Sequence, residues 1–327
     1  MLPPTLRTEL AAEDVDAIER LLSRIHANQP DRDPDPPVRP DHDDRAGASG
    51  FAAAMVRRPS DPSELAAYAQ AVRSGAGGWA MTLLVDPADR TDLLAIGAAA
   101  VHPVLAAVGE HGGGPVRWWV RGSNDEDLLL AERLGFDLDR ELVQLRVPLP
   151  LLPVTSSEGD EHEDAEDAPA PAPVTTDLVV RPFTPDDEDR WLEVNNAAFA
   201  GHPDQSGWTR DELAARRKER WYDPAGFLVH EGDDGQIDGF CWTKVHEEPE
   251  RLGEIYVIGV HPDAAGQGLG RSLVVAGLQH LAEQGLTTGM LWTEHDNEVA
   301  RHLYEDGLGF HLHHADRLHT AEVAATD

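Results

Sequence analysis

The sequence contains only one cysteine, Cys241, among its 327 residues. A single cysteine cannot form an internal disulfide, and it excludes a cysteine-rich zinc site. Because Cys241 lies in the apolar run 239–242, we expect a buried thiol. The sequence has 16 histidines, and His311 and His313 would share one face of a strand. No carboxylate or cysteine lies near them at ligand spacing, so we expect no metal.

Basic residues are scarce: 27 Lys and Arg stand against 60 Asp and Glu, which gives a formal charge of −33. This charge argues against nucleic acid or an anionic membrane as a partner. We interpret the acidic surface as an adaptation for solubility or high salt rather than a binding feature. No apolar run approaches the roughly 20 residues of a membrane-spanning helix, and residues 1–10 lack the pattern of a secretory signal. We expect a cytoplasmic monomer.

A chain of this length has room for two domains. An acidic run at 156–168 is followed by alternating Pro and Ala at 168–173, which is typical of an extended linker. We place an N-terminal domain at 1–152, the linker at 153–176 and a C-terminal domain at 177–327. The segment 31–44, rich in Pro and Asp, is either a substrate loop or disordered.

The two halves share a pattern near their ends: a Trp-containing strand, a polar turn, a helix, Leu-Gly-Phe and a final strand. Leu-Gly-Phe ends at Phe136 in the first half and at Phe310 in the second. The pattern predicts a tandem duplication of one fold; the alternative is two unrelated α/β domains. In the second half we expect a mixed α/β sheet with strands at 178–181, 226–231, 236–245 and 253–260, helices at 190–199 and from 209–212, and a turn at 232–235.

Three glycines, Gly266, Gly268 and Gly270, lie between the apolar strand 253–260 and an amphipathic helix that runs to Gln284. Such a loop lets backbone N–H groups converge on an anion, and the helix dipole adds positive charge there. We interpret the loop as a cradle for pyrophosphate. No Gly-Lys-Ser/Thr follows, and a strand meander precedes it, so it is neither a P-loop nor a βαβ dinucleotide loop.

The loop resembles the coenzyme A loop of GNAT-superfamily acetyltransferases, normally written Gln/Arg-x-x-Gly-x-Gly/Ala. Gly268 and Gly270 fit that pattern, whereas Ala265 stands where the family has Gln or Arg. Longer stretches are similar to the mycothiol synthase family, whose members also carry tandem GNAT domains: 194–199, 202–209, 240–244 and 253–260. The resemblance implies an acetyl-CoA-dependent transferase that acetylates the cysteinyl amine of a glucosamine–inositol precursor, the last step of mycothiol synthesis.

The resemblance also implies roles for individual residues. Glu254 matches the general base, acting through water, and Tyr304 matches the acid that protonates the coenzyme's sulfur. The residues implied to bind the coenzyme are Ile258, Gly259, Val260, Ala265, Gly266, Gln267, Gly268, Leu269, Gly270, Arg271, Asn297 and His302, with the N–H of Val260 as oxyanion donor. Those implied to bind the acceptor are Asp204, Lys244, Glu254 and Trp292, although Asp204 replaces the usual Glu.

Each role has a plainer alternative. Glu254 could be a solvent-facing carboxylate, Tyr304 a packing residue and Lys244 a solvated charge. In the first half, residues 83–94 occupy the position of the coenzyme loop but contain no glycine pair, and their aspartates would repel phosphate. We therefore predict a non-catalytic first copy. For the whole chain, the alternatives are a GNAT enzyme with another amine acceptor and a coenzyme A-binding protein without catalysis.

Overall fold

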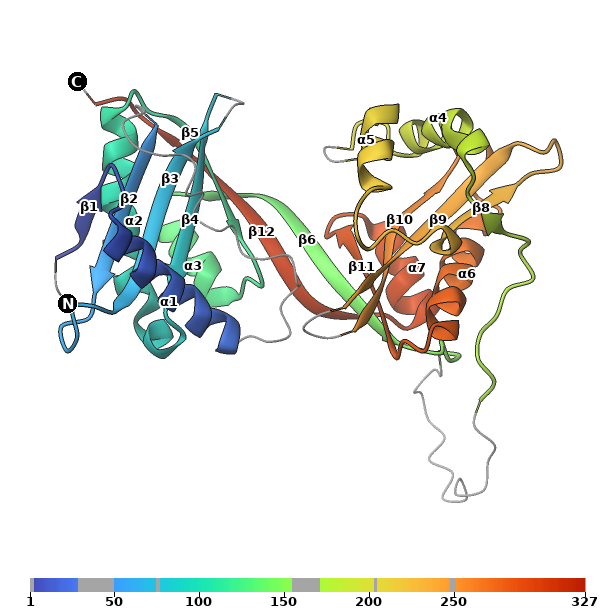
Figure 1. The fold of residues 1–327 in the computed structure, drawn as a ribbon, viewed down its shortest axis with the longest axis horizontal. Coiled ribbons are helices and arrows are strands. Elements are labelled where there is room, and N and C mark those ends of the chain that lie inside the picture. The colour runs from blue at the N-terminus through green and yellow to red at the C-terminus, as the bar shows by residue number, and fades with distance from the viewer. Residues whose placement is uncertain are drawn as a thin grey trace, which may run out of the picture. The chain divides into compact units, whose positions relative to one another are not determined.

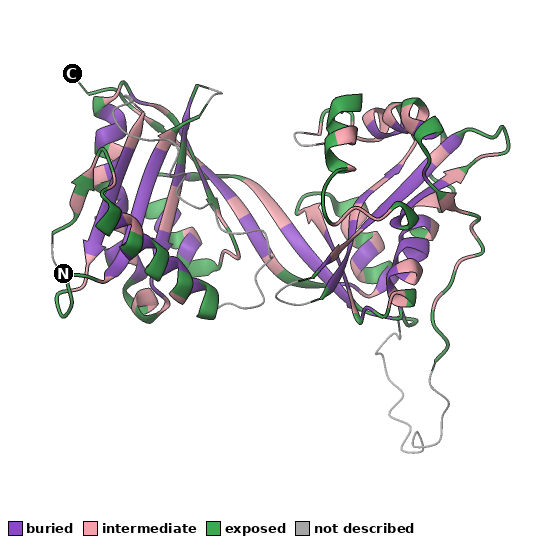
Figure 2. Ribbon diagram, in the orientation of Figure 1, coloured by how far each residue is buried: buried purple, intermediate pink, exposed green. Residues whose placement is uncertain are grey.

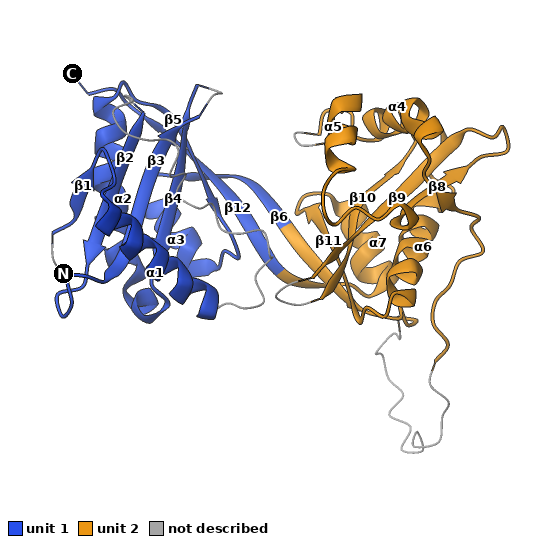
Figure 3. Cartoon of the chain, viewed as in Figure 1, with its two compact units in different colours: residues 1–142, 314–327 blue, residues 143–313 orange. Residues whose placement is uncertain are grey.

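The computed structural model describes residues 3–28, 50–74, 77–154, 171–202, 205–247 and 251–326. It divides into two compact units (Figure 3): unit 1 comprises residues 1–142 and 314–327, and unit 2 comprises residues 143–313. The segment 31–44, the residue Asp204 and residues 155–170 of the proposed linker lie outside the described residues.

The helices and strands follow the same order in both halves of the chain, apart from the helices η3, α5 and η4 of the second half, which have no counterpart in the described part of the first (Figure 1). The first half contains β1 (Thr5–Arg7), α1 (Ala12–Asn28), β2 (Phe51–Arg57), β3 (Leu65–Arg73), β4 (Trp79–Val85), η1 (Pro87–Asp92), α2 (Leu93–Glu110), β5 (Gly114–Val120), α3 (Asp125–Arg133) and β6 (Asp137–Pro148). The second contains β7 (Arg181–Pro182), η3 (Pro185–Asp187), α4 (Glu188–Ala198), α5 (Arg210–Arg216), η4 (Pro224–Gly226), β8 (Phe227–Glu231), β9 (Ile237–His246), β10 (Leu252–Val260), η5 (Pro262–Ala264), α6 (Leu269–Glu283), β11 (Thr288–Glu294), α7 (Glu298–Leu308) and β12 (His311–Val323). This order confirms the predicted mixed α/β class.

The predicted strand limits differ from the structure by one residue in β8, β9 and β10, and by more in β7. The first strand of the second half was expected at 178–181, but β7 pairs with β8 only through Arg181 and Pro182. Pro182 has no N–H with which to extend the ladder, as is usual for proline on an edge strand. Strand β9 continues one residue beyond its predicted end at Val245 and so includes His246.

The last strand of each half joins the sheet of the other half. Unit 1 has the strand order β1-β2-β3-β4-β5-β12, and unit 2 has β7-β8-β9-β10-β11-β6. β12 runs antiparallel to β5, with Arg317 opposite Val120 and Val323 opposite Gly114. Figure 3 shows β6 changing from the colour of unit 1 to that of unit 2 along its length. Each sheet is therefore completed by a strand distant in sequence.

Helix α2 supplies much of the core of unit 1. The segment Pro87–Glu110 is long and apolar enough to cross a membrane, by length and composition alone. The expectation that no segment reaches this length was therefore wrong. The side chains of Ile96, Val101 and Val104 are instead buried in the core of unit 1, where α2 packs on β2 and β3, as in the core helix of a globular domain. Figure 2 shows these central strands largely in the colour of buried residues. A core helix passes the same length test, so this segment is weak evidence for a membrane span.

The sheet of unit 2 carries α4 on one face and α6 on the other (Figure 1). On the α4 face, Trp191 packs among buried aromatic rings, and Phe227 stacks on Trp242 with 4.1 Å between ring centroids. On the α6 face, a Cβ added at Gly277 would lie 2.5 Å from the Sγ atom of Cys241. Cys241 is buried, as expected, and burial raises the pKa of its thiol to about 12. Tight packing on both faces fixes β9 and β10, the strands that carry the candidate site.

Candidate active site

The strands β10 and β11 are paired only at their beginnings. Their parallel register covers Gly253 to Ile255, opposite Gly289 to Leu291, and no pairing follows it. On its other edge β10 remains paired with β9 as far as Val260, with an irregularity between Ile255 and Val257. From Tyr256 onward, the edge of β10 that faces β11 thus has no strand partner among the described residues. Backbone N–H groups along such an edge are available to a ligand.

The glycine loop connects this open part of β10 to α6. Gly266 and Gly268 have φ of 81° and 78°, the left-handed region that side chains disfavour. Gly268 is the N-cap residue of α6, and no side chain there accepts a hydrogen bond from the first N–H groups of the helix. The next N–H groups, those of Leu269 and Gly270, have no acceptor within the helix. The loop therefore points unsatisfied donors and the positive end of the helix dipole at one place, as an anion site requires.

Ala265, the departure from the family pattern, ends the short helix η5. Its N–H donates to the carbonyl oxygen of Pro262 at 3.2 Å, so this N–H is already used within the loop. Ala265 has no side chain that could reach a phosphate. The anion-binding capacity of the loop therefore depends on the backbone from Gly266 onward.

Glu254 is buried on the α4 face of the sheet, two residues before the unpaired edge of β10 begins. It is 7% exposed, so the interpretation as a solvent-facing carboxylate is wrong. In the register of β9 and β10 it lies opposite Lys244, whose Nζ is 3.6 Å from its Oε2. The same oxygen is 2.7 Å from Nε2 of His246. A buried carboxylate is expected to have such partners, because an unpaired one is costly to desolvate.

Aromatic rings surround the ammonium group of Lys244. Its Nζ lies 5.5 Å from the ring centroid of Trp221 and 5.7 Å from that of Tyr256, within range of a cation–π contact. The two rings lie 4.8 Å apart. The Lys244 side chain is 15% exposed, so it is held in place and is not the solvated charge that the plainer reading describes. Sequence reasoning missed Trp221, Tyr256 and His246, although the spacing of His246 from Lys244 places both on one face of the strand.

Tyr304 lies on α7 and is 7% exposed. Its ring packs near Phe310, with 5.8 Å between centroids. Burial, with a smaller contribution from the thiol of Cys241, raises the pKa of Tyr304 to about 12. No group in the described part of the chain hydrogen-bonds its hydroxyl. The phenol therefore stays protonated near neutral pH and has a proton available to donate.

The other predicted site residues lie in different surroundings. Met290 of β11 is paired with Glu254 of β10. Trp292 lies two residues after Met290, so its side chain is on the same face of β11 as that of Met290. Asn297 caps α7, and its Oδ1 accepts the N–H of Ala300 at 3.1 Å. His302 is exposed and contacts the carboxylate of Asp306 at 2.7 Å. The structure thus brings Glu254 and Lys244 together and places Asn297 and His302 at the surface of α7.

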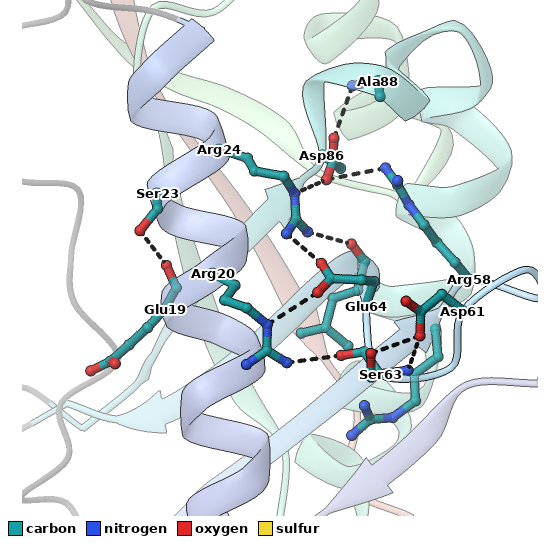
Figure 4. A network of polar contacts seen from close by, with 12 residues as sticks. Glu19, Arg20, Ser23, Arg24, Arg58, Asp61, Ser63, Glu64, Asp86 and Ala88 are labelled. Carbon is teal, nitrogen blue, oxygen red and sulfur yellow. Dashed lines mark hydrogen bonds and ion pairs between the residues drawn. The ribbon is translucent and has the colours of Figure 1, made fainter.

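The corresponding loop of unit 1 is occupied by its own charged side chains (Figure 4). It connects β4 to α2, as the glycine loop connects β10 to α6. Asp86 is buried there, and its Oδ1 accepts the N–H of Ala88 at 3.0 Å. Its Oδ2 is 2.5 Å from Nε of Arg24 and 3.1 Å from the guanidinium of Arg58. Glu64 also pairs with Arg24. Asp86 is the N-cap of η1, as His261 is of η5 in unit 2. The loop of unit 1 therefore begins at a buried carboxylate paired with arginines, where the loop of unit 2 begins at a histidine.

In the ranges that the structure describes, no three His, Cys, Asp or Glu side chains are grouped so as to hold a metal ion.

Comparisons with known proteins identify relatives of this chain. The sequence model of the Acetyltransferase (GNAT) family matches residues 189–310. Mycothiol acetyltransferase of Frankia alni is 42% identical over 247 residues, which cover 72% of this chain and 68% of the relative. Mycothiol acetyltransferase of Streptomyces coelicolor is 43% identical over 228 residues, which cover 69% and 67%.

Solved structures show the same fold. A GCN5-related N-acetyltransferase from Sphaerobacter thermophilus superposes with a TM-score of 0.63 at 21% identity, covering 100% of this chain and 98% of that one. A tandem GNAT protein from the clavulanic acid biosynthesis pathway superposes with a TM-score of 0.58 at 18% identity, covering 99% and 100%. The chain is thus a tandem GNAT fold, as the repeated sequence pattern predicted, and the alternative of two unrelated domains is wrong.

Proposed function

Because the chain belongs to the mycothiol acetyltransferase family, we propose that it transfers the acetyl group of acetyl-CoA to the cysteinyl amine of the cysteinyl-glucosaminyl-inositol precursor, the last step of mycothiol biosynthesis. It is an acetyl-CoA-dependent N-acetyltransferase of the GNAT type. The observation that carries the proposal is the place of Glu254. This residue is buried with two basic partners on the strand that leads, past the unpaired edge, into the glycine loop.

The pyrophosphate of acetyl-CoA is proposed to lie on the glycine loop, against the N–H groups from Gly266 to Arg271. The pantetheine and thioester then follow the unpaired edge of β10, where Ile258, Gly259 and Val260 offer backbone groups. The N–H of Val260 is the proposed donor to the oxyanion. Since Ala265 supplies no side chain to the phosphate, we expect the backbone and the helix dipole to provide most of the affinity there.

Amide formation from a thioester requires a neutral amine and a group that removes its proton as the new bond forms. Glu254 is the proposed base, acting through one water molecule. The amine nitrogen attacks the thioester carbon, and its proton passes by way of water to the free carboxylate oxygen of Glu254. Lys244 lies opposite in the register and offers its ammonium group to acceptor oxygens, while the aromatic rings around it exclude water.

When the tetrahedral intermediate collapses, the C–S bond breaks and the coenzyme leaves as a thiolate. Tyr304 is the proposed acid that protonates this sulfur. With its pKa raised to about 12, the phenol is protonated at working pH, whereas a free thiol has a pKa of about 8.5. Proton transfer from Tyr304 therefore has to be coupled to C–S cleavage, and reprotonation of Tyr304 from solvent completes the cycle.

Trp292 and Asp204 complete the proposed acceptor contacts, and Asn297 and His302 are proposed contacts of the coenzyme at the surface of α7. Unit 1 is proposed to be non-catalytic. This is supported by the loop between β4 and α2, which has no glycine and contains Asp86, Asp89 and Asp92, because carboxylates would repel a coenzyme anion. We place the reaction in the cytoplasm, with the protein as a monomer.

The proposal is tested by incubating the purified chain with acetyl-CoA and a panel of amines: the cysteinyl-glucosaminyl-inositol precursor, an aminoglycoside and a peptide with a free N-terminus. Free coenzyme A is measured by chromatography, because the precursor and its product both carry a thiol that would react with a thiol reagent. Among these amines, we expect turnover only with the precursor. Turnover only with another amine would replace the acceptor, and calorimetric acetyl-CoA binding without any turnover would favour a non-catalytic coenzyme-binding protein.

A further inference from the structure

His246 is a buried histidine at the candidate site to which the proposed chemistry gives no role. It is 6% exposed, and its partner Glu254 is 7% exposed. Its Nε2 lies 2.7 Å from Oε2 of Glu254, within the range of a charge-assisted hydrogen bond. Polar atoms removed from water are costly unless they are hydrogen-bonded, so this short contact between two buried side chains indicates a specific hydrogen bond.

The register of the sheet creates this contact. Glu254 lies opposite Lys244, and Leu252 lies opposite His246. His246 is therefore the diagonal neighbour of Glu254 on the same face, a position from which a long side chain can reach its partner. The hairpin positions the imidazole next to the carboxylate before any ligand binds.

The two oxygens of Glu254 have different surroundings. Oε2 is contacted by Nε2 of His246 and lies 3.6 Å from Nζ of Lys244. Oε1 has no hydrogen-bond partner in the part of the chain that the structure describes. One oxygen is therefore fixed by β9, and the other remains available to accept a proton.

The elements around Glu254 add no competing contact to its carboxylate. β11 places the apolar Met290 beside it, and α6 packs on the opposite face of the sheet. α4 shares the face of Glu254, and its contact with β10 includes Ala198, near Gly259. Among the charged and titratable groups of the described residues, Lys244 and His246 are the ones in contact with the carboxylate.

We propose that His246 is a positioning residue of the acetyl transfer: its Nε2–H donates to Oε2 of Glu254, fixes the plane of the carboxylate and leaves Oε1 facing the amine. No proton moves to or from His246. The proton of the amine passes through water to Oε1, while Oε2 stays bonded to the imidazole. This inference rests on the proposed function, in which Glu254 is the base.

Two substitutions separate this role from a structural one. His246→Gln keeps an N–H donor at about the place of Nε2, whereas His246→Leu keeps the volume and removes the donor. We expect His246→Leu to lower kcat about 10- to 100-fold, with KM for acetyl-CoA changed by less than about threefold. His246→Gln should restore kcat to within about threefold of the unsubstituted protein. His319→Leu is the matched control, since it replaces a buried histidine of unit 1, and it should leave kcat unchanged.

Three kinetic outcomes would overturn the inference. The first is a normal kcat in His246→Leu. The second is an equal loss in His246→Gln and His246→Leu, because it would mean that the imidazole has to titrate. The third is a rise in KM that matches the fall in kcat, because it would indicate damage to the binding site as a whole. Should His246→Leu fail to fold, the comparison of His246→Gln with the unsubstituted protein and the spectroscopic test below still decide the question.

The spectroscopic test needs no substrate. ¹⁵N NMR of the histidine side chains, with the His246 signals assigned by their loss in His246→Gln, reports which ring nitrogen carries the proton. We expect a protonated Nε2. An unprotonated Nε2 would overturn the inference. A protonated Nε2 in a protein that acetylates no amine would instead refute the proposed function and leave the His246–Glu254 contact intact, so the two failures are distinguishable.

Discussion

Replacing Gly268 by alanine tests whether the glycine loop works through its backbone conformation. Gly268 has a φ of 78° and caps α6, and a Cβ placed there would meet no atom within 4 Å. The penalty is therefore conformational rather than steric, about 1–2 kcal/mol for an L-residue in the left-handed region. A loop that relaxes to escape this penalty loses the aligned N–H groups.

Gly270 provides the matched control in the same loop. It lies inside the first turn of α6 with no positive φ, and its added Cβ would lie 3.8 Å from a methyl carbon of Val260, an ordinary contact. Alanine at a helical position is better than glycine by about 0.5–1 kcal/mol. Gly270→Ala should therefore stabilise the protein slightly and leave the loop's conformation unchanged.

Isothermal titration with acetyl-CoA and thermal unfolding measure both effects. We expect Gly268→Ala to weaken acetyl-CoA binding by about tenfold, which corresponds to about 1.4 kcal/mol, and to lower Tm. Gly270→Ala should keep Kd within about threefold and raise Tm by up to a few degrees. Equal affinities in the two variants, or an unchanged Kd in Gly268→Ala, would refute the reasoning that the left-handed cap aligns the phosphate donors.

Three further predictions concern other residues. Tyr304→Phe should lower kcat at least about 100-fold with little change in Tm, because the ring keeps its packing near Phe310 and loses only the proton donor; a kcat within threefold in steady-state kinetics would contradict this. Burial, together with the nearby Arg317, lowers the pKa of His319 in the folded protein. As pH drops below about 6.5, His319 is therefore protonated more readily in the unfolded chain than in the folded protein, and the free energy of unfolding should fall. Urea unfolding at pH 7 and pH 5.5 should show a smaller fall in His319→Leu, and an equal fall would count against the assignment. Hydrogen bonds donated by Arg181 lower the pKa of Asp187 to about 2, so the contribution of Asp187 to folding stability is present above its ordinary pKa and is lost as pH falls towards 2. Asp187→Asn should lower the free energy of unfolding by about 1–2 kcal/mol at pH 7. Calorimetry that shows no loss of Tm would contradict this.

The glycine loop and the strands beside it could be read from sequence because their determinants are local. Gly266 and Gly268 mark left-handed positions, and the alternating strand and the amphipathic helix around them are patterns of short range. The duplication was also visible, since Leu-Gly-Phe recurs near the end of each half. The contact between Glu254 and Lys244 then follows from the hairpin register.

The exchange of β6 and β12 between the sheets could not be predicted in the same way. An alternating strand has the same pattern whichever sheet it joins, and its partner is decided by contacts distant in sequence. His246 was missed for a simpler reason, because the predicted strand ended at Val245. The surroundings of Tyr304 and of Asp86 depend on packing across helices and strands that no local pattern encodes.

The central claim, that this chain acetylates the cysteinyl-glucosaminyl-inositol amine, is tested most directly by the thiol profile of cells with and without the protein. Thiols are derivatised, separated and identified by mass. We predict that cells without the protein lose the acetylated thiol and accumulate the free-amine precursor, and that Glu254→Gln fails to restore the profile. An unchanged thiol profile in cells that lack the protein would contradict the account.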